Sequence, residues 1–362
     1  MKICFIGPKA YSLFNQEMFP DFGGAEVQLF LLAKELAKNK NLDVNFIVAD
    51  YGQKELELYY GIKVWKAMKL DSEILNKILK FYNVLNRIDA DVYVDRTLKP
   101  ESSAVALYCK LKKKKFAYML ASDIEVDSRY SQKKGLIRSF ISKLAFKLAD
   151  IILVQNEYQQ KRLKTSENVF LLPPSFYQLH NIFRRKNHIL WVGRSESLKQ
   201  PFLFLELAKK FPKEKFVIVC PPSTPNPKLS MLVEKNARKI KNISFIKQAP
   251  FNKINSYYKK AKIFVNTSEY EGFPVTFVQA ASMGVPLLSL NVDPNKFIEK
   301  NNCGFVCSGD FILMKKMLNK MVFNKKLLKI MADNSYKYAK KNFNIKKNTK
   351  KFANILRLIE EF

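Results

Sequence analysis

Two cationic side chains lie close together near the middle of the chain. An apolar segment ends in Trp191-Val192-Gly193-Arg194, and Lys199 follows five residues after Arg194, shortly before Pro201. A guanidinium can bind phosphate oxygens in a fork, and an ammonium can act beside it as a movable point charge. The pair therefore predicts a diphosphate site; two exposed cations in a very basic protein are the alternative.

A second polar segment, NTSEYEGFPVT, occupies residues 266–276 directly after an apolar strand. Pro274 lies near the start of a predicted helix, where free N–H groups and the helix dipole favour an anion such as phosphate. Glu271 cannot bind phosphate, but it can accept hydrogen bonds from sugar hydroxyls. The segment is thus predicted to hold a sugar joined to a diphosphate; a helix-capping acid is the alternative for Glu271.

Short motifs follow one another in a specific order along nearly the whole chain. They are Gly23-Gly24-Ala25-Glu26, then Val192-Gly193-Arg194 with Lys199, then Glu271-Gly272-Phe273-Pro274 with Ala280 and Gly284-Val285-Pro286. Together they resemble glycosyltransferase family four, of the bacterial type that makes polysaccharides and glycolipids. The resemblance implies a retaining enzyme with the GT-B fold. That fold has two Rossmann-like parallel-sheet domains facing a central cleft, with a C-terminal helix crossing back to the first domain.

The resemblance also implies roles for individual residues. It places Arg194, Lys199 and Glu271 in catalysis, with the two cations on the donor diphosphate and the carboxylate on the transferred sugar. The implied donor-binding residues are Gly193, Gly272, Phe273, Pro274, Val275, Thr276 and Gln279. The implied loop for the phosphates and the acceptor comprises Gly23, Gly24 and Glu26, with Asp123 as a further candidate.

The chain departs from the family pattern in three places. Gln279 replaces the second glutamate of the pair, which implies an altered contact to the nucleotide ribose. Residues 221–225, PPSTP, replace a Gly-x-Gly turn and leave the base pocket undefined. Residues 119–123, MLASD, lie where many members have a histidine. Asp123 could contact the sugar or acceptor, or only cap a loop.

Other chemistries find little support in the sequence. The two histidines, His180 and His188, lie near the predicted linker and build neither a Ser-His-Asp arrangement nor a zinc site. No glycine fingerprint closely follows the first strand, which argues against a nicotinamide dehydrogenase. We expect no metal and no cofactor, with a nucleotide-diphosphate sugar as co-substrate and a UDP-sugar as the first candidate.

Short apolar runs alternate with amphipathic stretches, which is typical of parallel strands joined by helices and predicts the α/β class. The expected strands are 3–6, 44–48, 62–65, 92–94, 116–120, 151–154, 169–172, 189–192, 216–220, 243–246, 263–265 and 286–288. Pro173-Pro174 and the basic residues that follow indicate a domain boundary. We expect an acceptor-binding domain at 1–175, a nucleotide-sugar domain at 186–342 and a C-terminal helix at 343–362 on the first domain.

The chain is strongly basic, with 63 Lys and Arg against 32 acidic residues and a net charge of +31. Such a field favours anionic partners. Residues 110–115, KLKKKK, and a predicted helix over 133–147 could lie on an anionic membrane, or present one solvated face. The five cysteines are expected to be reduced and mostly buried, and no signal peptide or membrane span is evident. We expect a cytoplasmic protein, either free in the cytoplasm or peripheral on the inner face of the membrane.

The sequence therefore predicts a retaining glycosyltransferase that moves a sugar from a nucleotide-diphosphate donor to a hydroxyl of a glycan or lipid-linked acceptor. A nucleotide-sugar epimerase or a phosphorylase on the same fold is one alternative. A nucleic-acid or anionic-surface binding protein is another, although no nucleic-acid motif is evident. A transferase that binds sugars without catalysis is the third, suggested only by Gln279.

Overall fold

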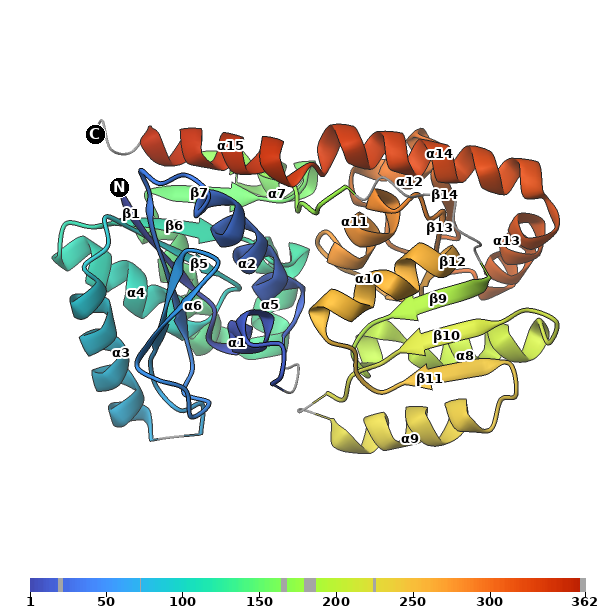
Figure 1. The fold of residues 1–362 in the computed structure, drawn as a ribbon, viewed down its shortest axis with the longest axis horizontal. Helices are drawn as coiled ribbons and strands as arrows, with labels where there is room; N and C mark the ends of the chain where they lie inside the picture. Colours follow the sequence, from blue (N-terminus) through green and yellow to red (C-terminus); the bar gives the residue numbers. More distant parts are fainter. Residues whose placement is uncertain (19–21, 72, 164–167, 179–186, 224–225, 359–362) are drawn as a thin grey trace. The chain divides into compact units, whose positions relative to one another are not determined.

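The computed structural model describes residues 1–18, 22–71, 73–163, 168–178, 187–223 and 226–358. The chain divides into two compact units (Figure 1). Unit 1 contains Met1–Ser175 and Ile345–Phe362, and unit 2 contains Phe176–Asn344. Each unit has its own sheet with helices packed against it, so each is described by itself.

Unit 1 is built on an eight-stranded sheet with the order β3-β4-β2-β1-β5-β6-β7-β8. The strands are β1 Lys2–Ile6, β2 Asp43–Val48, β3 Leu56–Tyr59, β4 Ile62–Lys66, β5 Val92–Arg96, β6 Lys115–Met119, β7 Ile151–Val154 and β8 Val169–Leu171. Their pairings are parallel except that β3 and β4 form an antiparallel hairpin. The predicted strands of the first half are confirmed, whereas β3 was not predicted.

The β3–β4 hairpin turns at Tyr60 and Gly61, both of which have positive φ angles. Two left-handed residues in succession match the twist of a two-residue hairpin. Strand β3 has the sequence LELY and leaves Leu58 71% exposed, as suits an edge strand. It has no buried apolar run, which is why a search for such runs misses it.

Helices cover both faces of the unit 1 sheet. They are α1 Tyr11–Phe14, α2 Gly24–Leu36, α3 Ile74–Ile88, α4 Pro100–Leu111, α5 Ser128–Lys134, α6 Leu136–Leu148, α7 Glu157–Arg162 and α15 Ile345–Arg357, with short 3-10 turns η1 Pro8–Ala10 and η2 Asp123–Val126. The C-terminal helix α15 packs on α2 (Figure 1). Asn348 of α15 donates a hydrogen bond to Ser175 Oγ at 2.7 Å. These contacts join the last helix to unit 1.

The prediction of one helix over 133–147 is wrong. Helix α5 ends at Lys134 and α6 begins at Leu136, and Gly135 between them has a φ of 84°. A left-handed residue cannot continue a right-handed helix, and glycine adopts that conformation without steric cost.

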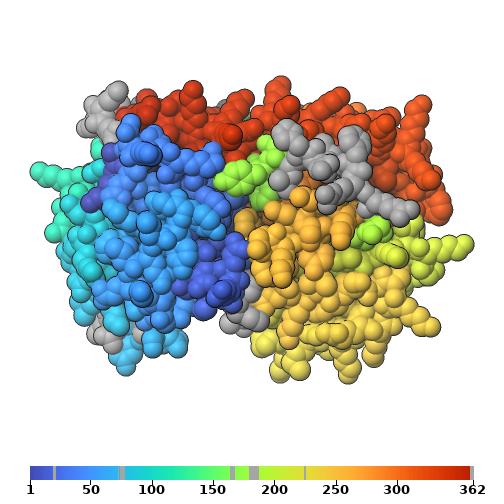
Figure 2. Space-filling view, in the orientation of Figure 1, coloured from blue at the N-terminus to red at the C-terminus, as the bar shows by residue number. Residues whose placement is uncertain are grey.

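Unit 2 has a six-stranded parallel sheet with the order β11-β10-β9-β12-β13-β14. The strands are β9 His188–Val192, β10 Phe216–Val219, β11 Ile243–Ile246, β12 Ala261–Asn266, β13 Leu287–Ser289 and β14 Gly304–Val306. The helices are α8 Pro201–Lys210, α9 Pro227–Arg238, α10 Phe251–Lys260, α11 Val275–Ser282, α12 Phe297–Lys300, α13 Phe311–Phe323 and α14 Lys325–Asn342, with turns η3 Ser197–Lys199 and η4 Pro294–Lys296. Helix α9, yellow in Figure 2, packs beside β11 and leaves Met231 71% exposed.

The two parallel-sheet α/β units confirm the predicted fold class. The predicted strands of the second half are also present, and β14 is an addition of three residues. All five cysteines are buried and unpaired, as expected. Within the described residues, none of the helices combines the length and hydrophobicity that a membrane crossing requires. The domain limits themselves, and the cleft, stay predictions.

Candidate functional site

The loop after β9 carries the first predicted motif. Gly193 directly follows β9, and a Cβ on Gly193 would lie 2.9 Å from the indole of Trp191. A side chain at this position would therefore require the Trp191 ring to shift. Arg194 follows on the loop and is half-buried. Its side chain makes no ion pair or hydrogen bond with any residue in the described part of the chain. The guanidinium is thus available to a ligand.

Lys199 and Glu271, far apart in the sequence, form an ion pair of 2.7 Å between Nζ and Oε2. Both side chains are mostly buried, with 23% and 15% exposed. The other carboxylate oxygen of Glu271 accepts hydrogen bonds from Ser268 Oγ at 2.7 Å and Asn266 Nδ2 at 3.0 Å. The structure thus joins the cationic loop to the acidic loop, as the two predicted motifs require.

Burial would raise the pKa of Glu271, but the Lys199 ammonium and the hydrogen bonds from Lys199, Ser268 and Asn266 outweigh it. The pKa therefore lies below its ordinary value. Glu271 is a carboxylate at neutral pH and can only accept hydrogen bonds, as contacts to sugar hydroxyls require.

A hydrogen-bonded chain fixes the position of Lys199. Trp191 Nε1 donates to Thr267 Oγ1 at 2.9 Å, and the Thr267 hydroxyl donates to the Lys199 carbonyl at 2.6 Å. Glu269 N also donates to Leu198 O at 3.0 Å. The ends of the neighbouring strands β9 and β12 are thereby held in one arrangement, at the carboxyl edge where open parallel sheets bind ligands.

Helix α11 begins directly after the acidic loop. The first N–H groups of a helix have no intrahelical acceptor, so those of Val275 and Thr276 are oriented for an anion. Phe273 differs from the expectation, because its side chain is buried, stacking on Phe297 at 5.7 Å and packing edge-on against Phe343 at 5.4 Å. Only its backbone can face a ligand, while Gly272 and Pro274 are buried in the same turn.

Gln279 lies on α11 and is only 6% exposed. Its Oε1 accepts a hydrogen bond of 3.2 Å from the hydroxyl of the buried Tyr258. The amide is therefore part of the packing of unit 2. The sequence analysis predicted only an altered ribose contact at this position, not this buried hydrogen bond.

The proline-rich loop lies against the cationic loop. Ser195 N donates to Pro221 O at 3.3 Å, and the hydroxyls of Ser195 and Ser230 lie 2.5 Å apart. Residues 224 and 225 of this loop lie outside the described residues, as do His180 and the basic linker around Arg184. His188 is buried in β9, which fits the expected structural role.

In unit 1, the predicted acceptor residues lie at the ends of helices. Gly23 and Gly24 begin α2, and Glu26 Oε2 accepts a hydrogen bond of 2.8 Å from Gly23 N. Glu26 thus caps its own helix. Asp123 Oδ1 accepts hydrogen bonds from Asn156 Nδ2 and Gln159 Nε2, each at 2.9 Å. Burial raises the pKa of Asp123, and these hydrogen bonds partly offset that effect. Asp123 therefore links η2 to α7. This contact corresponds to the second of the two roles considered for Asp123, which is to hold a loop in place.

Sequence reasoning missed a polar group at the carboxyl edge of the unit 1 sheet. Arg96 is the last residue of β5 and only 5% exposed, and its Nε has no hydrogen-bond partner in the described part of the chain. The Oε1 atom of Gln155, directly after β7, is also buried without a hydrogen-bond partner among the described residues. The available signal was Asp95-Arg96, two charged residues ending an apolar run.

Glu125 lies in the same region and is 3% exposed. Burial raises its pKa to about 7, although hydrogen bonds from Tyr118 and from Ala121 N act in the opposite direction. The carboxyl group is thus close to half-protonated at neutral pH.

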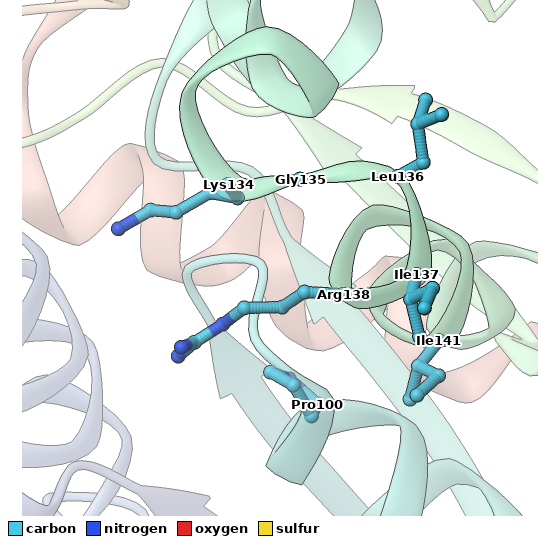
Figure 3. A pocket seen from close by; sticks show the side chains of 7 residues that line it. All are labelled: Pro100, Lys134, Gly135, Leu136, Ile137, Arg138 and Ile141. Carbon is cyan, nitrogen blue, oxygen red and sulfur yellow. The ribbon is translucent and has the colours of Figure 1, made fainter.

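Helix α6 and the residues before it form the basic apolar surface, which we define as Lys133 to Lys147. Its apolar side chains Leu136, Ile137 and Phe140 are 80%, 80% and 77% exposed. Lys134 and Arg138 extend to one side, and Leu136, Ile137 and Ile141 point away from them (Figure 3). Together with Pro100 they line a shallow hollow. From 128 to 149 the sequence has no acidic residue.

Within the described residues, no three His, Cys, Asp or Glu side chains come together as a metal site would require. The residues brought together are instead Lys199 and Glu271, with Arg194 on the same loop.

Comparison with known proteins identifies the region that contains these residues. Residues 177–352, just under half of the chain, match the family model described as Glycosyl transferases group 1. This segment is therefore similar to the group 1 glycosyl transferase domain. An uncharacterized glycosyltransferase of Haemophilus influenzae is 24% identical over 354 residues, which cover 92% of this chain and 96% of that protein. One from Methanocaldococcus jannaschii is 28% identical over 186 residues, covering 44% of this chain and 45% of that protein. These matches support a glycosyltransferase.

Solved structures share the whole fold at low sequence identity. Sucrose-phosphate synthase from Thermosynechococcus elongatus has a TM-score of 0.81 at 13% identity, covering 100% of this chain and 99% of that one. Anabaena HepE, solved with UDP and glucose, has a TM-score of 0.75 at 14% identity and covers 99% of both chains. A UDP-GlcNAc 2-epimerase from Neisseria meningitidis reaches 0.63 at 14% identity, covering 98% of this chain and 99% of that one. The GT-B fold is thereby established, and it is shared with an epimerase.

Proposed function

We propose that this glycosyltransferase moves a sugar, with retention of anomeric configuration, from a nucleotide-diphosphate donor to a hydroxyl of a glycan or lipid-linked acceptor. The Lys199–Glu271 pair, with Arg194 on the same loop as Lys199 and unpaired within the described residues, carries the proposal. It joins cations suited to a diphosphate with a carboxylate suited to sugar hydroxyls. A UDP-sugar is the first candidate donor, since the related HepE was solved with UDP.

In the proposed reaction the acceptor oxygen forms a bond to the anomeric carbon on the face from which the diphosphate leaves. The bond from that carbon to the diphosphate oxygen breaks, and its electron pair stays on the diphosphate. The acceptor proton passes to a diphosphate oxygen. Arg194 and Lys199 stabilise the charge that develops on the leaving group, while the N–H groups at the start of α11 add to the same field.

The nearest alternative is epimerisation of a nucleotide sugar, because that activity occurs on the same fold. It is disfavoured here because the matched family model and both curated relatives are those of glycosyltransferases. An epimerase would convert its nucleotide sugar without an acceptor, whereas a transferase would release nucleoside diphosphate only as sugar is transferred to an acceptor or, slowly, to water.

The test is turnover of a panel of UDP, GDP and ADP sugars by wild type and by Arg194→Ala. We expect release of nucleoside diphosphate to fall roughly 100-fold or more, since oxyanion contacts contribute on this scale. Arg238→Ala is the matched control, because it removes the same charge from an exposed ion pair of unit 2. Unchanged turnover in a folded Arg194→Ala variant would refute the assignment.

We further propose that the enzyme works in the cytoplasm at the inner face of an anionic membrane, through the basic apolar surface. Leu136, Phe140 and Leu144 repeat at four-residue spacing on α6 and are 80%, 77% and 39% exposed. Such side chains can enter the acyl boundary while the neighbouring cations meet lipid phosphates. The +31 charge attracts the protein to the same surface.

Vesicle flotation tests this docking. Wild type should float with vesicles of phosphatidylcholine mixed with phosphatidylglycerol at moderate salt, and not with phosphatidylcholine alone. Ile137→Asn should reduce retention severalfold. Ile312→Asn is the matched control, because Ile312 lies in unit 2 and is 74% exposed against 80% for Ile137. Equal retention of the two variants would exclude α6 as the docking element.

A further inference from the structure

The unit 1 sheet carries an unexplained cation at its carboxyl edge. Arg96 ends β5 with only 5% of its surface exposed. No hydrogen bond or ion pair from its guanidinium to another described residue is present, and its Nε is fully buried without a partner. Burial lowers the pKa of Arg96 to about 10, while Glu125, Tyr118 and Glu26 oppose this shift through electrostatic attraction. The group remains a cation, so the fold carries a nearly buried, unpaired positive charge.

Such a charge is costly unless it is paired, and a bound anion would supply the missing partner. Nε is completely enclosed, and 5% of the residue's surface remains exposed. The backbone also makes an unusual turn directly after Arg96. Thr97, which follows Arg96, has a φ of 79°, a strained conformation for a β-branched residue.

The surroundings suit a polar ligand. The carboxyl ends of β5, β6 and β7 are adjacent, since these strands pair in that order. Gln155, directly after β7, contributes a buried Oε1 that has no hydrogen-bond partner among the described residues. Glu125 and Glu26 attract Arg96 electrostatically, but neither forms an ion pair or hydrogen bond with it in the described part of the chain. Asp95 precedes Arg96 on the strand, so its side chain points to the opposite face of the sheet.

We propose that Arg96 binds an anionic group of the acceptor, a phosphate or a carboxylate, at the carboxyl edge of β5 to β7. A guanidinium fork matches the paired oxygens of either group. That the anion belongs to the acceptor rests on the proposed transferase function. The binding of the anion itself does not, because all of its determinants lie in unit 1.

Calorimetric titration with inorganic phosphate tests the site in an Arg194→Ala background, which weakens the other candidate phosphate site. We expect Arg96→Met to weaken phosphate binding about tenfold or more. Arg87→Met is the matched control, because Arg87 lies in unit 1 in an exposed ion pair with Glu55 and its loss changes the net charge equally. Equal phosphate affinity in the two variants would overturn the proposal.

Thermal unfolding without ligand separates binding from structure. If Arg96 serves binding, the Arg96→Met variant should be as stable as wild type or more stable, because an apolar chain of similar length replaces a buried cation. A structural arginine would instead lower the melting temperature. A clearly less stable Arg96→Met that keeps wild-type phosphate affinity would assign Arg96 to structure and overturn the proposal.

Two further arms distinguish the source of the anion. Binding of glycerol 3-phosphate that depends on Arg96 would support a soluble phosphomonoester. Retention on phosphatidic acid vesicles that depends on Arg96, but not on Ile137, would support a lipid phosphate. Failure of the proposed transferase function would be seen in a different measurement. Arg194→Ala would then bind and turn over nucleotide sugars like wild type, regardless of the phosphate affinity measured for the Arg96 variants.

Discussion

Glu271 accepts hydrogen bonds or an ion pair from three side chains, and this makes it sensitive to the loss of its charge. Glu271→Gln would leave the mostly buried Lys199 ammonium facing a neutral amide. We expect a stability loss of roughly 1–3 kcal/mol and a larger relative loss of turnover, about tenfold to 100-fold. Urea unfolding and donor turnover measure the two effects. A loss of stability without any loss of turnover would show that the Lys199–Glu271 pair has only a structural role.

Gln279 and Tyr258 form a buried pair that a double-mutant cycle can measure. Gln279→Leu leaves the Tyr258 hydroxyl without its acceptor and should cost about 1–3 kcal/mol. Tyr258→Phe removes the hydroxyl, and the double variant should cost less than the sum of the single variants. Additive free energies of unfolding would show that the hydrogen bond contributes nothing, and would leave Gln279 free for the ribose contact that the family pattern implies.

At the scale of elements, Gly304 determines how β14 joins the unit 2 sheet. A Cβ at this position would lie 1.7 Å from the carbonyl oxygen of Leu287 on β13, the strand that β14 pairs with. Backbone cannot yield by that amount without separating the strands. We expect Gly304→Ala to destabilise the protein by more than about 3 kcal/mol or to prevent folding. Circular dichroism on heating checks this, and a melting temperature within a few degrees of wild type would contradict the strand pairing.

The loops after β9 and β12 form the other informative unit at this scale. Neither loop alone presents a complete site, because Arg194 and Lys199 lie on one and Glu271 on the other. Their alignment depends on neighbouring parallel strands, whose carboxyl ends lie at the same edge of a sheet. The loop sequences thus supply the charged side chains, and the pairing of β9 with β12 places the two loops next to each other.

At the scale of the whole molecule, His188 makes stability depend on pH. Burial lowers its pKa to about 4 from 6.5, although Nε2 donates a hydrogen bond to Tyr257 O. Because the folded state binds this proton less readily than the unfolded state, the stabilising effect is complete above pH 6.5 and is lost as pH falls toward 4. We expect a loss on the order of 2–3 kcal/mol across that window.

The measurement is the free energy of unfolding from pH 7.5 to 4 for wild type and His188→Gln. The glutamine variant removes this one titration while other groups continue to titrate, among them Glu125, whose raised pKa acts in the opposite direction. The difference between the two profiles therefore isolates His188. Parallel profiles would show that the histidine does not titrate differently on folding.

Much of the architecture follows from local pattern. Buried parallel strands such as β1 and β12 have apolar, β-branched runs, and their alternation with amphipathic helices predicts two α/β units. The amphipathic edge strand β3 and the three-residue β14 escape such reasoning, since neither has a run long enough to stand out. The single helix predicted over 133–147 overlaps α6, but the break between α5 and α6 depends on the backbone conformation of Gly135.

The sequence by itself determined the chemical types at the candidate donor site, because Arg194, Lys199 and Glu271 lie in short motifs whose composition indicates cations and a carboxylate beside a strand end. Only the tertiary structure decided which of these groups touch. It paired Lys199 with Glu271, buried the side chains of Phe273 and Gln279, and left Arg96 Nε without a hydrogen-bond partner among the described residues. The physical reason is that hydrogen bonding and burial are properties of neighbours, and strands far apart in the chain become neighbours only when the sheet forms.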